Sequence, residues 1–224
     1  MNIYIDLECI PRVTPTLRDE LAAGIKPPAT MSKPETIAAW EAEKKPALID
    51  EAVARAGLDA ATGMIVCVGF AIEDEPACVI SAGGTEDEDE CETLDLFFSA
   101  LNGRVPANSG RRPTLIGHNL AAFDVPYILR RCIVQRIRPP LWWPRNPKPW
   151  SDGLFDTMTA WSGDRGTISM DRLCRVLGVP GKGDGPSGAD VWPMAQAGKF
   201  AEIATYCRED VERTRQIHKR LTFA

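Results

Sequence analysis

The sequence predicts an α/β fold with a mixed central sheet flanked by helices, and three observations support this prediction. Apolar runs of strand length alternate along the chain with segments of helical spacing. The 224 residues suffice for one large core, or for one core with a sizeable insertion. Residues 12–62, rich in Ala, Lys and Glu, interrupt the alternation. We therefore expect a single domain over residues 1–224 with a helical insertion at 12–62.

Four segments are predicted to be strands of the sheet. Residues 2–7 form a first strand, and the apolar run at 64–73 forms a second. A third strand is expected at 77–82, and 114–116 is a short buried strand.

Four further segments are predicted to be helices. Residues 92–101 have apolar side chains at helical spacing and end near Gly103, and a second helix covers 123–135. Leu173, Val176 and Leu177 mark a helix that Gly178 ends, and the last helix covers 201–221. The acidic run at 86–92 carries six charges in seven residues. It is expected to be a solvated loop without a ligand role.

Acidic residues at the end of the first strand indicate a metal site. Asp6 and Glu8 are two residues apart, so in a strand their side chains point to the same face. Two like charges held that close are unfavourable unless a cation neutralises them. Later segments can add the carboxylates of Asp124 and Asp210. Carboxylates are hard oxygen ligands that suit Mg²⁺ or Mn²⁺ better than zinc.

Three motifs carry a resemblance to a known family. They are Asp-x-Glu at 6–8, Asn-x-x-x-Phe-Asp at 119–124 and Tyr-x-x-x-Asp at 206–210. In this order they resemble the exonuclease motifs of the DEDD superfamily, and most closely the proofreading 3′–5′ exonuclease domain of family B DNA polymerases. The resemblance covers about residues 1–11 and 62–224, and it implies a ribonuclease H-like fold. A competing subclass has a histidine five residues before the last aspartate, where this chain has Thr205, so the tyrosine subclass fits better.

The resemblance implies two divalent cations, Mg²⁺ or Mn²⁺, as cofactors. Asp6, Glu8 and Asp210 would hold one ion, and Asp6 together with Asp124 would hold the second. Tyr206 lies one helical turn before Asp210 and would orient the attacking water. Taken alone, Tyr206 could equally be a buried core tyrosine, and Asp210 a surface charge.

Substrate contacts are also implied by the resemblance. Asn119 and Phe123 match positions that contact or wedge the terminal nucleotides, although a turn former and a core ring would explain them equally. Cys9 stands where the family often has a hydroxyl residue next to the 3′ end. Lys182, in a glycine-rich loop, would touch a substrate phosphate or belong to a flexible linker. Asp156 resembles an additional acidic position, or it is a helix cap.

A basic segment stands out against the net charge of −5. Between residues 130 and 150 there is no acidic residue, and cations that attract phosphate alternate with rings that can stack on unpaired bases. Alternatively, the first two arginines form a solvated helix face and the tryptophans pack under a Pro-rich loop. The residues are Arg130, Arg131, Arg136, Arg138, Arg145, Lys148, Trp142, Trp143 and Trp150. The two histidines are expected to be structural at His118 and solvated at His218.

The insertion leaves two interpretations open. Its helices are expected to be broken by Pro27-Pro28, Pro34 and Pro46. It is either a surface insertion that packs on the sheet or lengthens the domain, or a clamp or partner-binding arm, since it starts just after Glu8.

The sequence therefore predicts a metal-dependent 3′–5′ exonuclease that hydrolyses DNA from its 3′ end, preferably single-stranded, by a two-metal mechanism. The alternatives are an RNA-trimming exonuclease of the same superfamily and a catalytically silent binding module. Unneutralised carboxylates would repel one another, which disfavours the silent module. Expected partners are single-stranded DNA 3′ ends, with replication or recombination proteins as further candidates in DNA repair or proofreading.

Seven scattered cysteines without a Cys-x-x-Cys pair favour reduced thiols and a cytoplasmic location. No apolar run has the length of a membrane span, so we expect no membrane partner.

Overall fold

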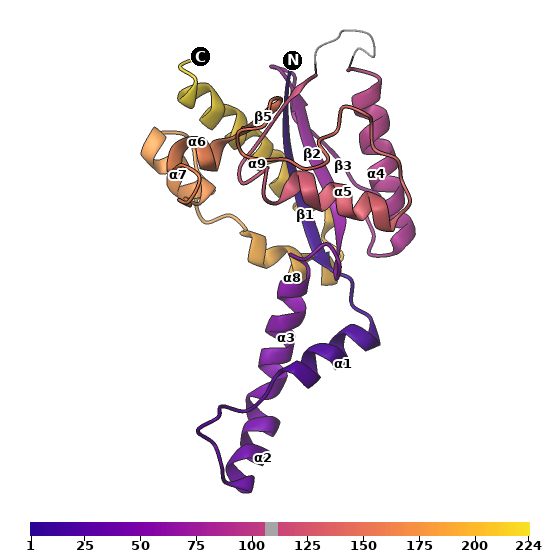
Figure 1. The fold of residues 1–224 in the computed structure, drawn as a ribbon, viewed down its shortest axis with the longest axis vertical. Coiled ribbons are helices and arrows are strands. Elements are labelled where there is room, and N and C mark those ends of the chain that lie inside the picture. The colour runs from indigo at the N-terminus through magenta and orange to yellow at the C-terminus, as the bar shows by residue number, and fades with distance from the viewer. Residues whose placement is uncertain (106–111) are drawn as a thin grey trace.

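The computed structural model of the protein describes residues 1–105 and 112–224. Within these residues, five strands form one mixed sheet in the order β3-β2-β1-β4-β5 (Figure 1). β1 pairs antiparallel with β2 and β2 with β3, while β4 runs parallel to β1 and β5 parallel to β4. The strands are β1 (Asn2–Pro11), β2 (Gly63–Ile72), β3 (Cys78–Ile80), β4 (Thr114–Gly117) and β5 (Leu154–Asp156). The predicted mixed α/β fold is confirmed.

Helices cover both faces of this sheet. Helices α4 and α5 pack on one face, and the long helix α9 crosses the other (Figure 1). The helices are α1 (Pro15–Gly24), α2 (Pro34–Glu43), α3 (Lys45–Ala56), α4 (Asp87–Asn102), α5 (Asp124–Val134), α6 (Thr157–Ser162), α7 (Met170–Leu177), the 3₁₀ turn η1 (Gly188–Asp190), α8 (Val191–Gln196) and α9 (Phe200–Leu221). No helix in 1–105 or 112–224 is long and apolar enough to cross a membrane.

Strand β1 divides its side chains between the two faces. Ile3, Ile5 and Leu7 are buried in the core under α4 and α5, whereas Tyr4 and Ile10 pack with residues of α9. Because side chains alternate along a strand, the residues at positions 6 and 8 lie on the α9 face. The pairing with β2 shifts between Glu8 and Cys9. Such bulges are common beside active sites, where they change the direction of side chains.

The acidic run is the first departure from the sequence prediction. Residues 87–92 are the first turns of α4 and not a loop, because carboxylates stabilise the positive end of the helix dipole. Glu86 and Asp89 also form a reciprocal capping box. Glu90 is fully buried. Strand β5, helices α6 and α8 and the turn η1 were not predicted, since three to six residues are too few to show a period.

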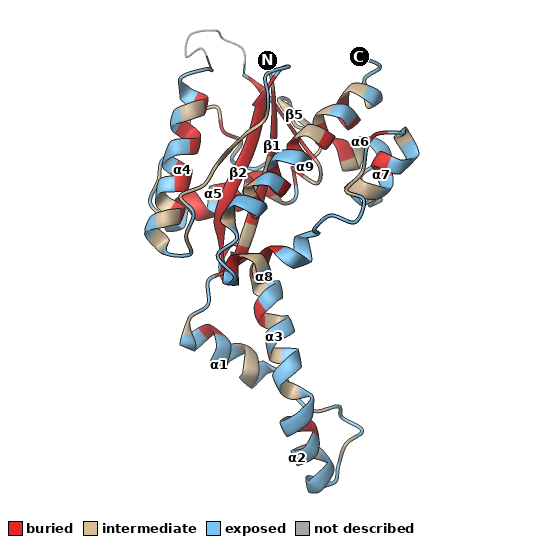
Figure 2. Cartoon of the chain, turned by 180° about the vertical axis from the view of Figure 1, so that it is seen from behind, coloured by how far each residue is buried: buried red, intermediate tan, exposed pale blue. Residues whose placement is uncertain are grey.

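The insertion forms three helices that project from the sheet, and we call residues 12–62 the helical arm (Figure 1). Figure 2 shows that its helices are mainly exposed, and their buried residues are Leu17, Trp40 and Val53. As predicted, prolines separate the helices: Pro27-Pro28 lie between α1 and α2, and Pro34 and Pro46 stand in the first turns of α2 and α3. A missing N–H is harmless there because it would have no partner within the helix.

Two residues predicted at the surface, Arg131 and His218, lie in the interior, and Trp143 is packed inside, in agreement with the alternative interpretation of the tryptophans. Arg131 is 1% exposed and binds Glu90, so it belongs neither to a solvated helix face nor to a nucleic-acid surface. Trp143 packs on Phe98 in the core. His218 is buried rather than solvated, with its Nδ1 atom 3.1 Å from the hydroxyl of Tyr4. The remaining predicted cations of the basic segment and Trp150 are exposed.

Candidate active site

Four carboxylates meet in one cleft of about 600 Å³. Asp6 and Glu8 come from β1, Asp124 from the first turn of α5 and Asp210 from the middle of α9. Glu8, Asp124 and Asp210 are buried, and Asp6 is partly buried. The topology explains this meeting, because β4 lies parallel to β1 and delivers the start of α5 next to it.

A tight turn between β4 and α5 positions Asp124. Asn119 has a φ of 64°, a left-handed conformation that Asn tolerates better than most residues. The carboxylate of Asp156 accepts the backbone N–H groups of Asn119 and Ala121, each at 3.0 Å, and it also caps α6. The geometry of Asp156 therefore agrees with the helix-cap interpretation, and that of Asn119 with a turn former.

Tyr206 and Asp210 face the cleft together, one turn apart on α9. Two cations contact Asp210: the Nζ atom of Lys182 lies 2.9 Å from Oδ2, and Arg213 donates to Oδ1 at 2.6 Å. The ammonium of Lys182 also contacts the Tyr206 hydroxyl. Lys182 is thus held in the site instead of in a free linker. Arg213 was missed, although its three-residue spacing from Asp210 was a usable signal.

The electrostatics of the site favour a bound cation. Burial, and then repulsion by Asp124 and Asp210, raises the pKa of Asp6 well above its usual value. Burial and the charge of Asp6 raise the pKa of Glu8 in the same way, and burial raises the pKa of Asp124 to about 8. The Oδ2 atom of Asp6 is buried and has no hydrogen-bond partner among the described residues. Apart from Asp210, which contacts Lys182 and Arg213, the carboxylates therefore have no ion pair among the described residues that would stabilise their charged forms.

The donor set fits a hard divalent ion. Oxygen ligands in this number suit Mg²⁺ or Mn²⁺. The sequence did not indicate that Cys207 borders this site. Its Sγ atom lies within 4.8 Å of carboxylate oxygens of Asp6 and Glu8. Burial raises the pKa of the Cys207 thiol, and its Sγ lies 3.6 Å from the backbone oxygen of Asp6. A thiol is a softer ligand than a carboxylate, so the carboxylates are the better match to Mg²⁺ or Mn²⁺.

The walls of the cleft are mainly apolar and come from several elements. Phe123 and Cys9 line it beside the carboxylates, and Trp192 of α8 lies on its rim. Phe123 packs on Tyr127 with ring centroids 5.3 Å apart. His118 also borders the cleft, where its ring nitrogens contact the Thr157 hydroxyl at 2.9 Å and the Ile168 carbonyl at 2.8 Å. These two contacts fix the His118 ring, and burial lowers its pKa.

Comparison with known proteins relates this chain to one family by sequence and to a solved structure by fold. Residues 60–223 match a family described as predicted 3′–5′ exonucleases related to the exonuclease domain of PolB. No curated protein matches the chain. The family B DNA polymerase of the hyperthermophilic archaeon Pyrobaculum calidifontis has a similar structure, with a TM-score of 0.60 and 16% identity. The match covers 99% of this chain and 24% of the polymerase. At this identity the likeness shows the fold alone, which is the ribonuclease H-like fold.

Proposed function

The chain belongs to the family of predicted 3′–5′ exonucleases related to the exonuclease domain of PolB, and from this membership we propose that it hydrolyses DNA from the 3′ end, preferably single-stranded DNA. The observation that carries the proposal is the meeting of four carboxylates from β1, α5 and α9 in one cleft. Water would attack the last phosphodiester, the P–O bond to the departing 3′ oxygen would break, and a 5′-monophosphate would leave.

Exonuclease domains of this kind use divalent metals, and the carboxylates are the candidate ligands. We assign Asp6, Glu8 and Asp210 to one Mg²⁺ or Mn²⁺, and Asp6 with Asp124 to a second. When bound, these ions would activate water and neutralise the charge that develops on the phosphate and the leaving oxygen.

Tyr206 and Lys182 would position the reactants. Burial raises the pKa of Tyr206, so its hydroxyl stays protonated and can orient water by hydrogen bonding but does not act as a base. Lys182 supplies positive charge beside Asp210 and would contact a substrate phosphate. Arg213 holds the other oxygen of Asp210 and so fixes the direction of this carboxylate.

The walls of the cleft support the proposed preference for single strands. Phe123 and Trp192 present aromatic rings beside the carboxylates. Rings stack on bases only when the bases are unpaired, and such stacking depends little on sequence.

The test is a digestion assay with Mg²⁺ or Mn²⁺ on end-labelled single-stranded DNA, duplex DNA and RNA of one sequence. We expect stepwise release of mononucleotides from the 3′ end, fastest on single-stranded DNA, and none from the Asp6→Asn variant. A circular strand or a 3′-phosphate should resist digestion, while a 5′ block should not. Rapid cutting of circles would indicate an endonuclease, faster digestion of RNA would indicate an RNA-trimming enzyme, and binding without cleavage would indicate a silent module.

A further inference from the structure

The active-site cleft has one wall that lies outside the part of the chain shared with the family. Ala54, Arg55, Gly57 and Leu58, at the end of α3 and just after it, line the same cleft as the carboxylates. The family match begins only at residue 60. This wall, like strand β1 with Asp6 and Glu8, therefore lies outside the residues that match the family.

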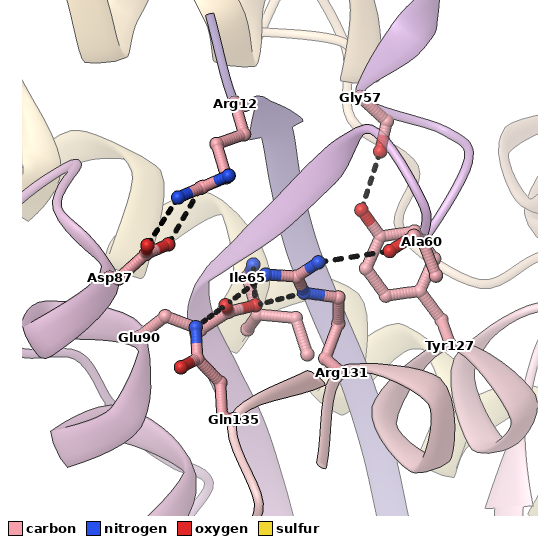
Figure 3. A network of polar contacts seen from close by, with 9 residues as sticks. All are labelled: Arg12, Gly57, Ala60, Ile65, Asp87, Glu90, Tyr127, Arg131 and Gln135. Carbon is pink, nitrogen blue, oxygen red and sulfur yellow. Dashed lines mark hydrogen bonds and ion pairs between the residues drawn. The ribbon is translucent and has the colours of Figure 1, made fainter. Parts of the chain in front are cut away.

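The end of α3 is in close contact with β1. A Cβ atom at Gly57 would lie only 2.8 Å from backbone atoms of Ile10 and Pro11, so only glycine allows this approach. The hydroxyl of Tyr127, on α5, donates to the carbonyl oxygen of Gly57 at 2.7 Å (Figure 3). Since Asp124 is also on α5, the same helix positions a carboxylate and the arm.

Two further contacts attach the arm to the body of the protein. At the C-terminal end of the arm, Arg131 donates to the carbonyl oxygen of Ala60 at 3.0 Å, and it is also paired with the buried Glu90. At its beginning, Arg12 pairs with Asp87 of α4 at 2.7 Å (Figure 3). Because both ends of the arm are bound to the body, the wall is held at the cleft before any substrate arrives.

The side chains on this wall suit a nucleic-acid strand. Leu58 is 64% exposed and lines the cleft, so its apolar side chain is open to a bound strand. Arg55 pairs with Glu51 at 2.6 Å, and both side chains are more than half exposed. Exposed pairs of this kind contribute little stability, so Arg55 can exchange Glu51 for a phosphate with little loss.

We propose that the end of α3 and the residues just after it form a substrate-binding wall, on which Leu58 packs against the nucleic-acid strand and Arg55 pairs with a phosphate upstream of the terminal nucleotide. This inference rests on the proposed function and extends it to residues of the arm. From Glu51 to Gly57 the wall extends about 9 Å along the helix at 1.5 Å per residue. One stacked nucleotide rises about 3.4 Å, so a wall of this length is long enough to contact more than one nucleotide.

The test compares Arg55→Ala and Leu58→Ala with two controls on the same arm. Arg18→Ala removes an exposed arginine that is paired with Asp50, and Leu48→Ala removes an exposed leucine of α3; neither side chain lines the cleft. Binding of a fluorescent single-stranded oligonucleotide is measured by anisotropy over a salt series, in the Asp124→Asn background with Mg²⁺. KM and kcat are measured in the otherwise unchanged enzyme.

We expect each wall variant to weaken binding and raise KM by about 3- to 10-fold, with kcat within about twofold. Arg55→Ala should also reduce the slope of log affinity against log salt by about 0.7, whereas Leu58→Ala should not change it. The controls should bind like the parent protein.

The outcomes separate the two proposals. If the parent enzyme digests DNA, and both wall variants bind and hydrolyse it as the parent does, the proposed role of the wall is wrong and the exonuclease proposal is kept. The proposed role of the wall would also be wrong if the control variants weakened binding equally, or if the parent protein bound no strand. If the parent protein binds a strand without hydrolysing it, and the wall variants weaken that binding, the proposed role of the wall is supported and the exonuclease proposal fails.

Discussion

Two buried clusters of charged side chains in this protein differ in how completely their charges are paired. The paired cluster consists of Glu90, Arg131 and Gln135, and the carboxylate cluster consists of Asp6, Glu8, Asp124 and Asp210. In the paired cluster, both oxygens of Glu90 accept hydrogen bonds from Arg131, at 2.8 and 2.6 Å (Figure 3). The backbone of Ile65 and the side chain of Gln135 add one donor each, at 2.7 and 2.6 Å.

The carboxylate cluster is incompletely paired. The two close cations, Lys182 and Arg213, both contact Asp210, and one oxygen of Asp6 has no partner among the described residues. A buried charge that is fully paired can hold structural elements together. A buried charge that is left unpaired destabilises the protein unless a ligand completes it. The two clusters therefore differ in pairing more than in burial, and the incompletely paired one is the candidate active site.

The largest expected effect is a loss of activity in the carboxylate cluster. Asp6→Asn and Asp124→Asn should each lower kcat by about 10³-fold or more, because each removes a group that acts in the transition state. Without divalent ions their melting temperatures should equal or exceed that of the parent protein, since one repelling charge is gone. Nucleotide release and thermal melting in a chelator measure the two effects. Near-normal activity in both variants would show that the site is wrongly assigned.

In the paired cluster we expect the reverse, a loss of stability. Arg131→Met should lower the free energy of unfolding by about 3–5 kcal/mol, because Glu90 would remain buried without its counter-charge. Urea denaturation measures this loss. The matched control is Glu90→Gln combined with Arg131→Met, which removes the orphaned charge and should recover part of the stability. A double variant as unstable as the single one would contradict this explanation.

A smaller loss of activity is expected when the hydroxyl of Tyr206, beside the carboxylate cluster, is removed. Tyr206→Phe should lower kcat by about 10- to 100-fold, because the attacking water would lose its orientation. Its melting temperature should change little. The control, Tyr127→Phe, removes another buried hydroxyl and the 2.7 Å hydrogen bond to Gly57, so it should lower stability instead. An unchanged kcat with a lowered melting temperature would remove Tyr206 from the mechanism.

The smallest expected effect is a dependence of stability on pH in the metal-free protein. Folding raises the pKa of Asp124 to about 8, against about 3.9 in an unfolded chain, chiefly by burial. A raised pKa of an acid stabilises the folded state at low pH, and this contribution is lost as the pH rises from about 4 through about 8.

Melting in a chelator at pH 5 and pH 8 should therefore show a larger loss of stability in the parent protein than in Asp124→Asn, by about 1 kcal/mol or more. Saturating Mg²⁺ should reduce the loss, because the ion stabilises the ionised carboxylates. An identical pH response in the two proteins would mean that Asp124 ionises normally.

Local patterns in the sequence determined the class of fold and the family. The apolar runs of β1 and β2 and the helical spacing of α4, α5 and α9 appear at the predicted places, because such periods depend on neighbouring residues. The motif spacing likewise identified the carboxylates that the structure brings into one cleft. Their roles as ligands, and those of Tyr206 and Lys182, remain predictions.

Only the tertiary structure decided which charges are paired and where the arm lies. Arg131 meets Glu90 across 41 residues of sequence, and Lys182 meets Asp210 across 28. A charged side chain carries no local sign of such a partner, so Arg131 looked like a surface cation. In the same way, α3 became a wall of the cleft only because Gly57 and Tyr127 bring it against β1 and α5. Periodicity is a property of neighbours, whereas pairing depends on contacts between distant segments that exist only after the chain has folded.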